Sequence, residues 1–224
     1  ELGVSVHNDA RAIERCVDKS MTSFLLHKAG IPTPPTWAVE SVEAARRFVR
    51  SEARPGRPLV LKPLFGSQGR GLRLIERVAD LPTADDIGGV YYLQHFVGGR
   101  PPGWRDWRVF VIGGGAVAAM VRNGVTWRTN ASQGARCLPA PATGEIAALA
   151  VSAAAAVDAS YAGVDIIQDA GGRHLVLEVN SMPAWAALQR VTAVDIAGEL
   201  AASLLAQFRP AAPSSGSRRA AGRR

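Results

Sequence analysis

The chain has 224 residues, of which 47% are hydrophobic, and its mean hydropathy is +0.05. A chain of this length and apolar content can bury a core, which excludes a disordered chain and predicts one large domain or two closely packed small ones. Two cysteines and four histidines occur without a CxxC or Cys/His cluster, which excludes a disulfide framework and a zinc site and favours a reducing cytoplasm.

The formal net charge of +7 would suggest a nucleic-acid partner, but the charge is unevenly distributed. Five arginines follow Phe208 in a stretch without acidic residues, and subtracting those five leaves +2 for the rest of the chain. Residues 209–224 contain only Pro, Ala, Ser, Gly and Arg, a composition that predicts a disordered basic tail. The uncharged stretch 109–121 is too short to cross a bilayer, so we expect no membrane association.

Capping and turn residues divide the chain into helices and strands, and no internal repeat is present. Helices are expected where a capping Asn, Asp, Ser or Thr opens a helical run: 8–17, 20–29, 42–51, 144–157 and 195–208. Strands are expected in short apolar or β-branched runs between turn residues: 58–65, 72–75, 90–97, 107–112, 116–122, 164–169 and 174–180.

A lysine in a short apolar strand is the first candidate for ligand binding. Lys62 lies in the run 58–65, and a buried ammonium group is costly unless an anion meets it. The glycine-rich run 66–71 follows directly, and its three glycines can turn successive amide groups toward an anion. The run matches neither a Walker A sequence nor a GxGxxG that opens a helix, and a simple turn between strands is an equally good interpretation.

Arginine and aspartate side chains gather on the strands from Trp107 to Arg122. Asp106, Arg108, Arg122 and Arg128 belong to this group. By themselves, these residues favour a solvated strand face with loose ion pairs, each of which contributes little to stability.

A hairpin near the C-terminal end provides the strongest signal. If Gly171 and Gly172 form a two-residue loop, Asp165 lies opposite Glu178, and Asn180 lies on the same face two residues further along. Two carboxylates ~5 Å apart repel each other unless a cation lies between them or one is protonated. Three oxygen ligands suit Mg²⁺ or Mn²⁺. The alternative is an ordinary solvated sheet face, against which the apolar neighbours argue.

The order of these motifs resembles that of the ATP-grasp superfamily, and within it that of the RimK-type α-L-glutamate ligases. The residues of the motifs look most similar to those of the pterin-cofactor (tetrahydromethanopterin) ligases. The resemblance covers roughly residues 8–206. It rests on seven pieces in a fixed order: 18–19 with 30–34, 61–63 with 66–71, 94–97, 106–108, 127–130, 163–165 and 177–180. It implies an α+β ATP-grasp fold in which two α+β subdomains enclose ATP.

The resemblance also implies roles for individual residues. ATP would contact Lys19 and Lys62, the glycine-loop residues Gly66, Ser67, Gln68, Gly69 and Gly71, the adenine-facing segment Gln94, His95, Phe96 and Val97, and Asp106. Two Mg²⁺ or Mn²⁺ ions would be held by Asp165, Glu178 and Asn180. Arg108, Arg128 and Asn130 would face the γ-phosphate and the acyl intermediate.

The implied reaction is amide formation driven by ATP. A carboxylate is phosphorylated to an acyl phosphate, which an amine then attacks; the amine is that of L-glutamate, and the acceptor is a pterin-like cofactor or a protein C-terminus. Metal and arginine groups are needed because two anions must meet. The alternatives are a catalytically silent ATP-binding module, or a nucleic-acid-associated protein that uses the tail. A homo-oligomer is compatible with the sequence.

The resemblance also predicts a division of the chain. Residues 1–19 would be the remnant of an N-terminal region, 20–97 the N-terminal subdomain with the glycine loop, 98–208 the C-terminal subdomain with the metal site, and 209–224 the tail. Two positions depart from the family pattern. His95 stands where many relatives have an acidic residue, which leaves the adenine contact to backbone groups, and Gln133 stands where several have arginine.

Overall fold

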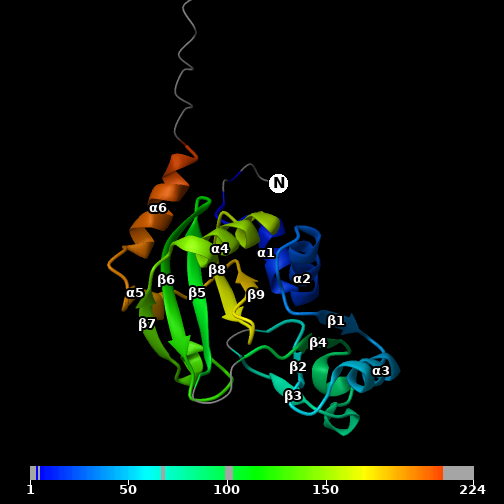
Figure 1. The fold of residues 1–224 in the computed structure, drawn as a ribbon. Helices are drawn as coiled ribbons and strands as arrows, with labels where there is room; N and C mark the ends of the chain where they lie inside the picture. Colours follow the sequence, from blue (N-terminus) through cyan, green and yellow to red (C-terminus); the bar gives the residue numbers. More distant parts are fainter. Residues whose placement is uncertain (1–3, 5, 67–68, 99–102, 209–224) are drawn as a thin grey trace, which may run out of the picture.

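The computed structural model describes residues 4, 6–66, 69–98 and 103–208. It contains two antiparallel sheets with helices packed on them, so the predicted α+β class is confirmed (Figure 1). Within the described residues, no helix is both long enough and apolar enough to cross a membrane.

The smaller sheet has four strands and a helix on one face. Its strand order is β1 (Thr36–Val39), β4 (Tyr91–His95), β2 (Leu59–Lys62) and β3 (Arg73–Ile75). Helix α3 (Val42–Glu52) begins after the N-cap Ser41, as predicted, and buries Ala45 and Val49 against the strands. Because side chains alternate along a strand, the apolar residues Leu59 and Leu61 face α3, and Lys62 faces the opposite side.

The larger sheet has five strands and is covered on both faces. Its order is β7 (Arg136–Ala140), β6 (Gly115–Asn123), β5 (Arg105–Ile112), β8 (Tyr161–Gln168) and β9 (His174–Asn180). Val109 and Val111 of β5 pack in the core that contains α4 (Gly144–Ala156). The alternate residues Phe110 and Ile112 pack in a second core with residues of α5 (Ala186–Gln189) and α6 (Ile196–Ala206) (Figure 1).

Two short helices connect the sheets at the N-terminal side. Helix α1 (Ala10–Val17) begins after the N-cap Asp9, and α2 (Lys19–Lys28) after the N-cap Asp18, whose carboxylate accepts from two backbone N–H groups. Leu26 and Ile31 join the core of the larger sheet, whereas α2 also contacts β1. The division of the chain at residue 20 remains a prediction.

The hairpin of β8 and β9 differs from its predicted form at the turn. Asp165 pairs with Glu178 and Gly163 with Asn180, as predicted. The two-residue glycine loop is wrong, because the last pair is Gln168 with His174 and five residues connect the strands. A β-bulge next to Asp165 shifts the register by one residue and restores the predicted pairing at the far end.

Several short elements lie outside the predicted set. They are strands β1 and β7, helix α5 and the 3₁₀ helices η1 (Val78–Asp80), η2 (Asp85–Ile87) and η3 (Ala131–Gln133). Each has only three to five residues, which is too short for a clear hydrophobic period. The remaining predicted elements are present with ends shifted by a few residues.

Candidate active site

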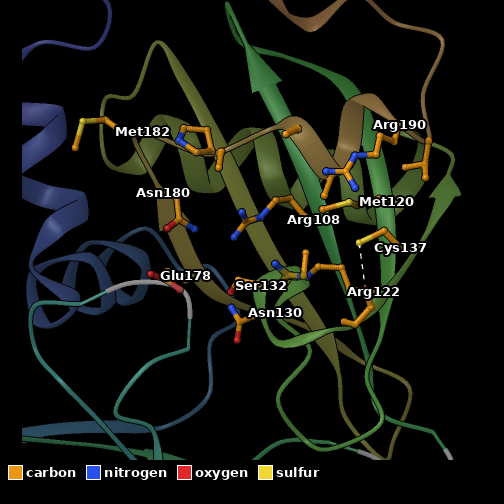
Figure 2. Close-up of a pocket in the computed structure, with 17 residues that line it drawn as sticks. Arg108, Met120, Arg122, Asn130, Ser132, Cys137, Glu178, Asn180, Met182 and Arg190 are labelled. Carbon is orange, nitrogen blue, oxygen red and sulfur yellow. Dashed lines mark hydrogen bonds between the residues drawn. The ribbon is translucent and has the colours of Figure 1, made fainter.

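Two neighbouring cavities lie at the larger sheet, and one of them also borders the smaller sheet. The main cavity, of about 590 Å³, is formed by the larger sheet and the segment after β9. The side cavity, of about 50 Å³, has Lys62 of the smaller sheet and Glu178 of the larger one in its wall. Asn130 and Glu178 line both cavities. In Figure 2, these two side chains lie on one side of the main cavity and Arg190 lies on the other. Ligands in the two cavities would therefore meet at Asn130 and Glu178.

Two lysines from different elements line the side cavity. Lys62 ends β2 and Lys19 begins α2. Burial lowers the pKa of Lys62 from 10.5 to about 8, although the Glu178 carboxylate opposes the shift. Burial also lowers the pKa of Lys19. Lys19 Nζ donates to the carbonyl oxygens of Gly66 at 2.7 Å and of Leu64 at 3.3 Å. Ammonium groups destabilised by burial gain from an anionic ligand.

The glycine loop comes close to the larger sheet's part of the site. Gly69 has φ +69° and lines the side cavity. A Cβ atom on Gly69 would lie 2.3 Å from Asn130 Oδ1, so only glycine allows this approach. Gly71, with φ +73°, is similarly close to Pro63, and Gly66 also lines the side cavity. The predicted contacts of Ser67 and Gln68 lie outside the described residues.

The arginine and aspartate group forms a buried ion-pair network. Arg108 Nε and Nη2 donate to the two carboxylate oxygens of Asp165, each at 2.7 Å. Arg122 donates to Asp106 at 2.7 and 2.6 Å, and its Nη2 lies 3.0 Å from Asp165 Oδ2. Only 3–4% of the Arg122, Asp106 and Asp165 side chains is exposed. The sequence-based preference for a solvated face is therefore wrong for these residues.

This network fixes the charge state of its central carboxylate. Burial alone would raise the pKa of Asp165, but the guanidinium groups of Arg108 and Arg122 outweigh it and hold the pKa at about 2. Asp165 is thus ionised at neutral pH, and its charge is already balanced by arginine.

Asp106 lies behind the cavity walls. Both of its carboxylate oxygens accept from Arg122, and one also accepts from the Thr129 hydroxyl at 2.6 Å. The residue is 2% exposed and lines neither cavity. Asp106 therefore supports Arg122 and Thr129, and its predicted contact with ATP stays a prediction.

The three predicted catalytic residues occupy different positions. Arg108 and Asn130 line the main cavity, as Figure 2 shows. Arg128 lines neither cavity; its Nη2 donates to the Leu72 carbonyl oxygen at 2.7 Å, and its guanidinium lies 5.1 Å from the Trp127 ring centroid. Among the described residues, the buried Arg128 Nε has no hydrogen-bond partner. Arg128 thus ties the segment after the glycine loop to the larger sheet's part of the site.

Glu178 and Asn180 are the predicted metal ligands that reach the main cavity. Asn180 Nδ2 donates to the Gly163 carbonyl at 3.3 Å, which leaves its amide oxygen for a ligand. Carboxylate and amide oxygens suit Mg²⁺, so these two side chains fit the ion. Asp165 has suitable chemistry, but both of its oxygens accept from arginine. In the described part of the chain, no three His, Cys, Asp or Glu side chains could hold a metal ion, so a site here depends on Asn180 and on phosphate oxygens.

The predicted adenine-facing segment is partly occupied by internal contacts. Gln94 is buried and donates to the Thr36 hydroxyl at 3.2 Å. The backbone N–H of His95 donates to Pro35 and that of Phe96 to Pro58. Phe96 also packs edge-on against two tryptophan rings. Backbone recognition of adenine would therefore fall on Val97 and on carbonyl groups in this segment.

The cavity also contains two arginines that the sequence-based set of site residues omitted. Arg122 could have been found, because it lies directly opposite Asp106 in the register of β5 and β6. Arg190 follows the four-residue helix α5 and carries no sequence motif. Nothing in its local sequence distinguishes it from a surface arginine.

Comparisons with known proteins indicate the family to which these residues belong. A model of the RimK-like ATP-grasp domain matches residues 16–204. The tetrahydromethanopterin:alpha-L-glutamate ligase of Methanococcus maripaludis is 36% identical over 207 residues, which cover 88% of this chain and 68% of that protein. The alpha-aminoadipate–LysW ligase LysX of Saccharolobus solfataricus is 30% identical, with 88% and 72% covered.

A solved structure shows the same fold. The ATP-grasp ligase PsnB in complex with its minimal precursor superposes with a TM-score of 0.70 at 29% identity, covering 92% of this chain and 65% of that chain. The chain thus spans about two thirds of the length of the relatives that it matches.

Proposed function

The chain belongs to the RimK-like ATP-grasp family, whose relatives are named ligases, and we propose that it is an ATP-dependent carboxylate–amine ligase. We propose L-glutamate as the amine and a pterin-like cofactor or a protein C-terminus as the carboxylate acceptor. The names of the glutamate ligase from Methanococcus maripaludis and of the LysW ligase support these two acceptor classes.

The chemistry has two steps. The acceptor carboxylate attacks the γ-phosphorus of ATP, which gives an acyl phosphate and releases ADP. The amine nitrogen then attacks the acyl carbon, an amide bond forms, and phosphate leaves with the bonding electrons. Both steps bring anions together, so positive charge and exclusion of water are the main requirements.

The chain's own residues meet these requirements. Lys19 and Lys62 would bind the phosphates in the side cavity, and the glycine loop would close over them and exclude water. Arg108 and Asn130 would face the transferred phosphoryl group, while Arg128 would position the loop from behind.

Glu178 and Asn180 would hold Mg²⁺, with Asp165 behind them. We also propose that Mn²⁺ can replace Mg²⁺ and that a second ion binds. A bound divalent ion neutralises phosphate charge and orients the γ-phosphate. The solved complex of PsnB with Mg and ADP supports a magnesium nucleotide in this fold.

One observation carries the proposal: Asn130 and Glu178 line both cavities, so a phosphate held by the lysines would reach the space in which an acceptor would bind. The test supplies ATP, Mg²⁺ and L-glutamate with candidate acceptors and measures ADP release and the mass of the acceptor. We expect an acceptor mass increase of one glutamate residue or more. Binding of ATP without ADP release for any acceptor would favour a silent nucleotide-binding module.

Replacing Glu178 with Gln keeps the shape of the side chain and removes its charge. We expect E178Q to reduce turnover by about 100-fold or more with an unchanged fold, because removing one group that stabilises charge in the transition state typically has an effect of this size. Circular dichroism checks the fold and ADP release checks the turnover. The control E145Q alters an exposed carboxylate in the first turn of α4, away from both cavities, and should retain full activity. Equal turnover of E178Q and wild type would remove Glu178 from the site.

A further inference from the structure

Three arginines line the main cavity, and their charges are balanced to different degrees. Arg108 pairs with Asp165, and Arg122 with both Asp106 and Asp165, so these two arginines and two aspartates are neutral as a group. Among the described residues, no carboxylate lies within ion-pair distance of Arg190. Arg190 is thus the cavity's uncompensated cation within the described chain.

The backbone that carries Arg190 is firmly held. Leu188 is fully buried in the core of the larger sheet. Gln189 Nε2 donates to the Val194 carbonyl at 2.8 Å, and Gln189 Oε1 accepts from the Ile196 N–H at 3.2 Å. These contacts fix the position from which the Arg190 side chain extends into the cavity.

The two ends of the main cavity differ in their chemistry. Glu178 and Asn130, where the phosphoryl group would arrive, lie across the cavity from Arg190 (Figure 2). The labelled side chains of Arg108 and Arg122, both already paired with aspartates, lie between these two ends (Figure 2). The lining of the cavity also includes the apolar side chains of Met120, Cys137, Met182 and Val191 and five alanines. This arrangement suits a small molecule with a reacting group at one end and an anion at the other end.

We propose that Arg190 binds a carboxylate of the amino-acid substrate and makes the site selective for amino acids with an acidic side chain over their neutral amides. This inference rests on the proposed ligase function and names the residue that recognises the amine substrate. Arg190 can form a two-pronged pair with a carboxylate because no described carboxylate pairs with its guanidinium, whereas Arg108 and Arg122 already donate to aspartates.

Calorimetry on the full chain loaded with Mg²⁺ and the ATP analogue AMP-PNP tests the proposal without an acceptor. L-Glutamate and L-glutamine are titrated into the wild type and into R190Q. The matched control is R136Q, which removes an exposed arginine of the neighbouring strand β7 that lines neither cavity. R190K retains the charge and serves as a second variant.

We expect the wild type and R136Q to bind glutamate at least about tenfold more tightly than glutamine, the usual contribution of one charge-assisted pair. R190Q should lose this preference with unchanged AMP-PNP affinity, and R190K should keep part of it. An unchanged preference in R190Q, or no glutamate binding to the loaded wild type, would overturn the role of Arg190. Failure of AMP-PNP itself to bind would instead contradict the proposed function.

Discussion

Burial of Lys62 sets the pH range in which this side chain is a cation that can bind phosphate. Its pKa of about 8 means that Lys62 in the free site loses its positive charge as the pH rises past that value. We expect the affinity for Mg-AMP-PNP to fall by up to about tenfold between about pH 7 and about pH 9, because only a minority of Lys62 is protonated at the higher pH. In K62M, the affinity should be weaker at both pH values and nearly constant. Calorimetry measures both.

The same pKa shift has a consequence for stability with a defined sign. Because the folded-state pKa lies below the ordinary value of 10.5, the unfolded chain binds more protons between about pH 8 and pH 10.5, and stability rises with pH there. K62M should reduce this slope and leave the part that comes from Lys19, whose pKa is also lowered by burial, whereas K28M, at the exposed end of α2, should not change it. If the full rise of stability with pH persisted in K62M, the rise would have to come from another group.

Gly163 is required by packing at the base of the predicted metal site. It pairs with Asn180, and a Cβ atom on it would lie 2.7 Å from the Pro183 side chain. We expect G163A to lower the free energy of unfolding by about 1–3 kcal/mol, since an overpacked core must shift backbone. Urea denaturation measures the change. The control is G115A, where the added Cβ would meet its nearest neighbour at an ordinary 3.7 Å; a similar loss there would show a general cost of replacing strand glycines.

At the residue scale, the sequence predicts the groups that line the cavities better than the groups that support them. Lys62 was found because a charged residue in an apolar strand is conspicuous, and Glu178 because the hairpin was expected to pair it with Asp165. The support role of Asp106 was not found, because the sequence alone does not show whether a carboxylate pairs with an arginine on the neighbouring strand or is solvated. Only the register of β5 and β6, which pairs Asp106 with Arg122, separates the two cases.

The hairpin of β8 and β9 shows the corresponding limit at the element scale. A glycine pair predicts a two-residue loop, but the Asp169 side chain accepts from the N–H groups of Gly171 and Arg173 and stabilises a longer one. The one-residue shift is then cancelled by the bulge beside Asp165. The predicted pairing at the site is confirmed, although the loop from which it was inferred is wrong.

Asn8 joins three elements around the site. Its Nδ2 donates to the carbonyl oxygens of Tyr161 and Ser181, and its Oδ1 accepts from the N–H groups of Ser160 and Tyr161. We expect N8A to lower the free energy of unfolding by on the order of 2–4 kcal/mol, because buried backbone groups lose their partners. Because Ser181 follows Asn180, the affinity for Mg-AMP-PNP should also fall.

Denaturation and calorimetry together test this prediction. The control N123A alters an asparagine at the end of β6, for which we expect a change below about 0.5 kcal/mol. Loss of stability in N8A without any loss of nucleotide affinity would limit Asn8 to folding and remove its link to Asn180.

At the scale of the whole molecule, each sheet has its own core, and the site lies between them. The core of the smaller sheet contains residues of α3 and its strands, whereas those of the larger sheet contain residues of α4, α5 and α6. Polar contacts of Lys19 with Gly66 and of Arg128 with Leu72 connect the two parts around the side cavity. The sequence predicts most strands of the two sheets but not these connections, because each joins a side chain to a distant backbone carbonyl.

A ligand that contacts both parts should stabilise the molecule as a unit, and this effect should depend on the metal. At 100 times its Kd, Mg-AMP-PNP would contribute about 2.7 kcal/mol, which for a chain of this size corresponds to a rise in Tm of roughly 5–10 °C. EDTA should remove most of this rise, because Glu178 would then face phosphate without a cation between them. An equal rise with EDTA would contradict a metal at Glu178 and Asn180.

Arg128 allows the contribution of the connection to be separated from that of the metal. R128A removes the hydrogen bond to Leu72 and should reduce the ligand-induced rise in Tm by about half, because the loop side would no longer be held against the larger sheet. R105A is the matched control: Arg105 lies 5.2 Å from the Trp107 ring centroid, much as Arg128 lies over Trp127, but its contacts stay within the larger sheet. If both variants lost the same part of the rise, stacking on tryptophan, and not the connection between the two parts, would explain the effect.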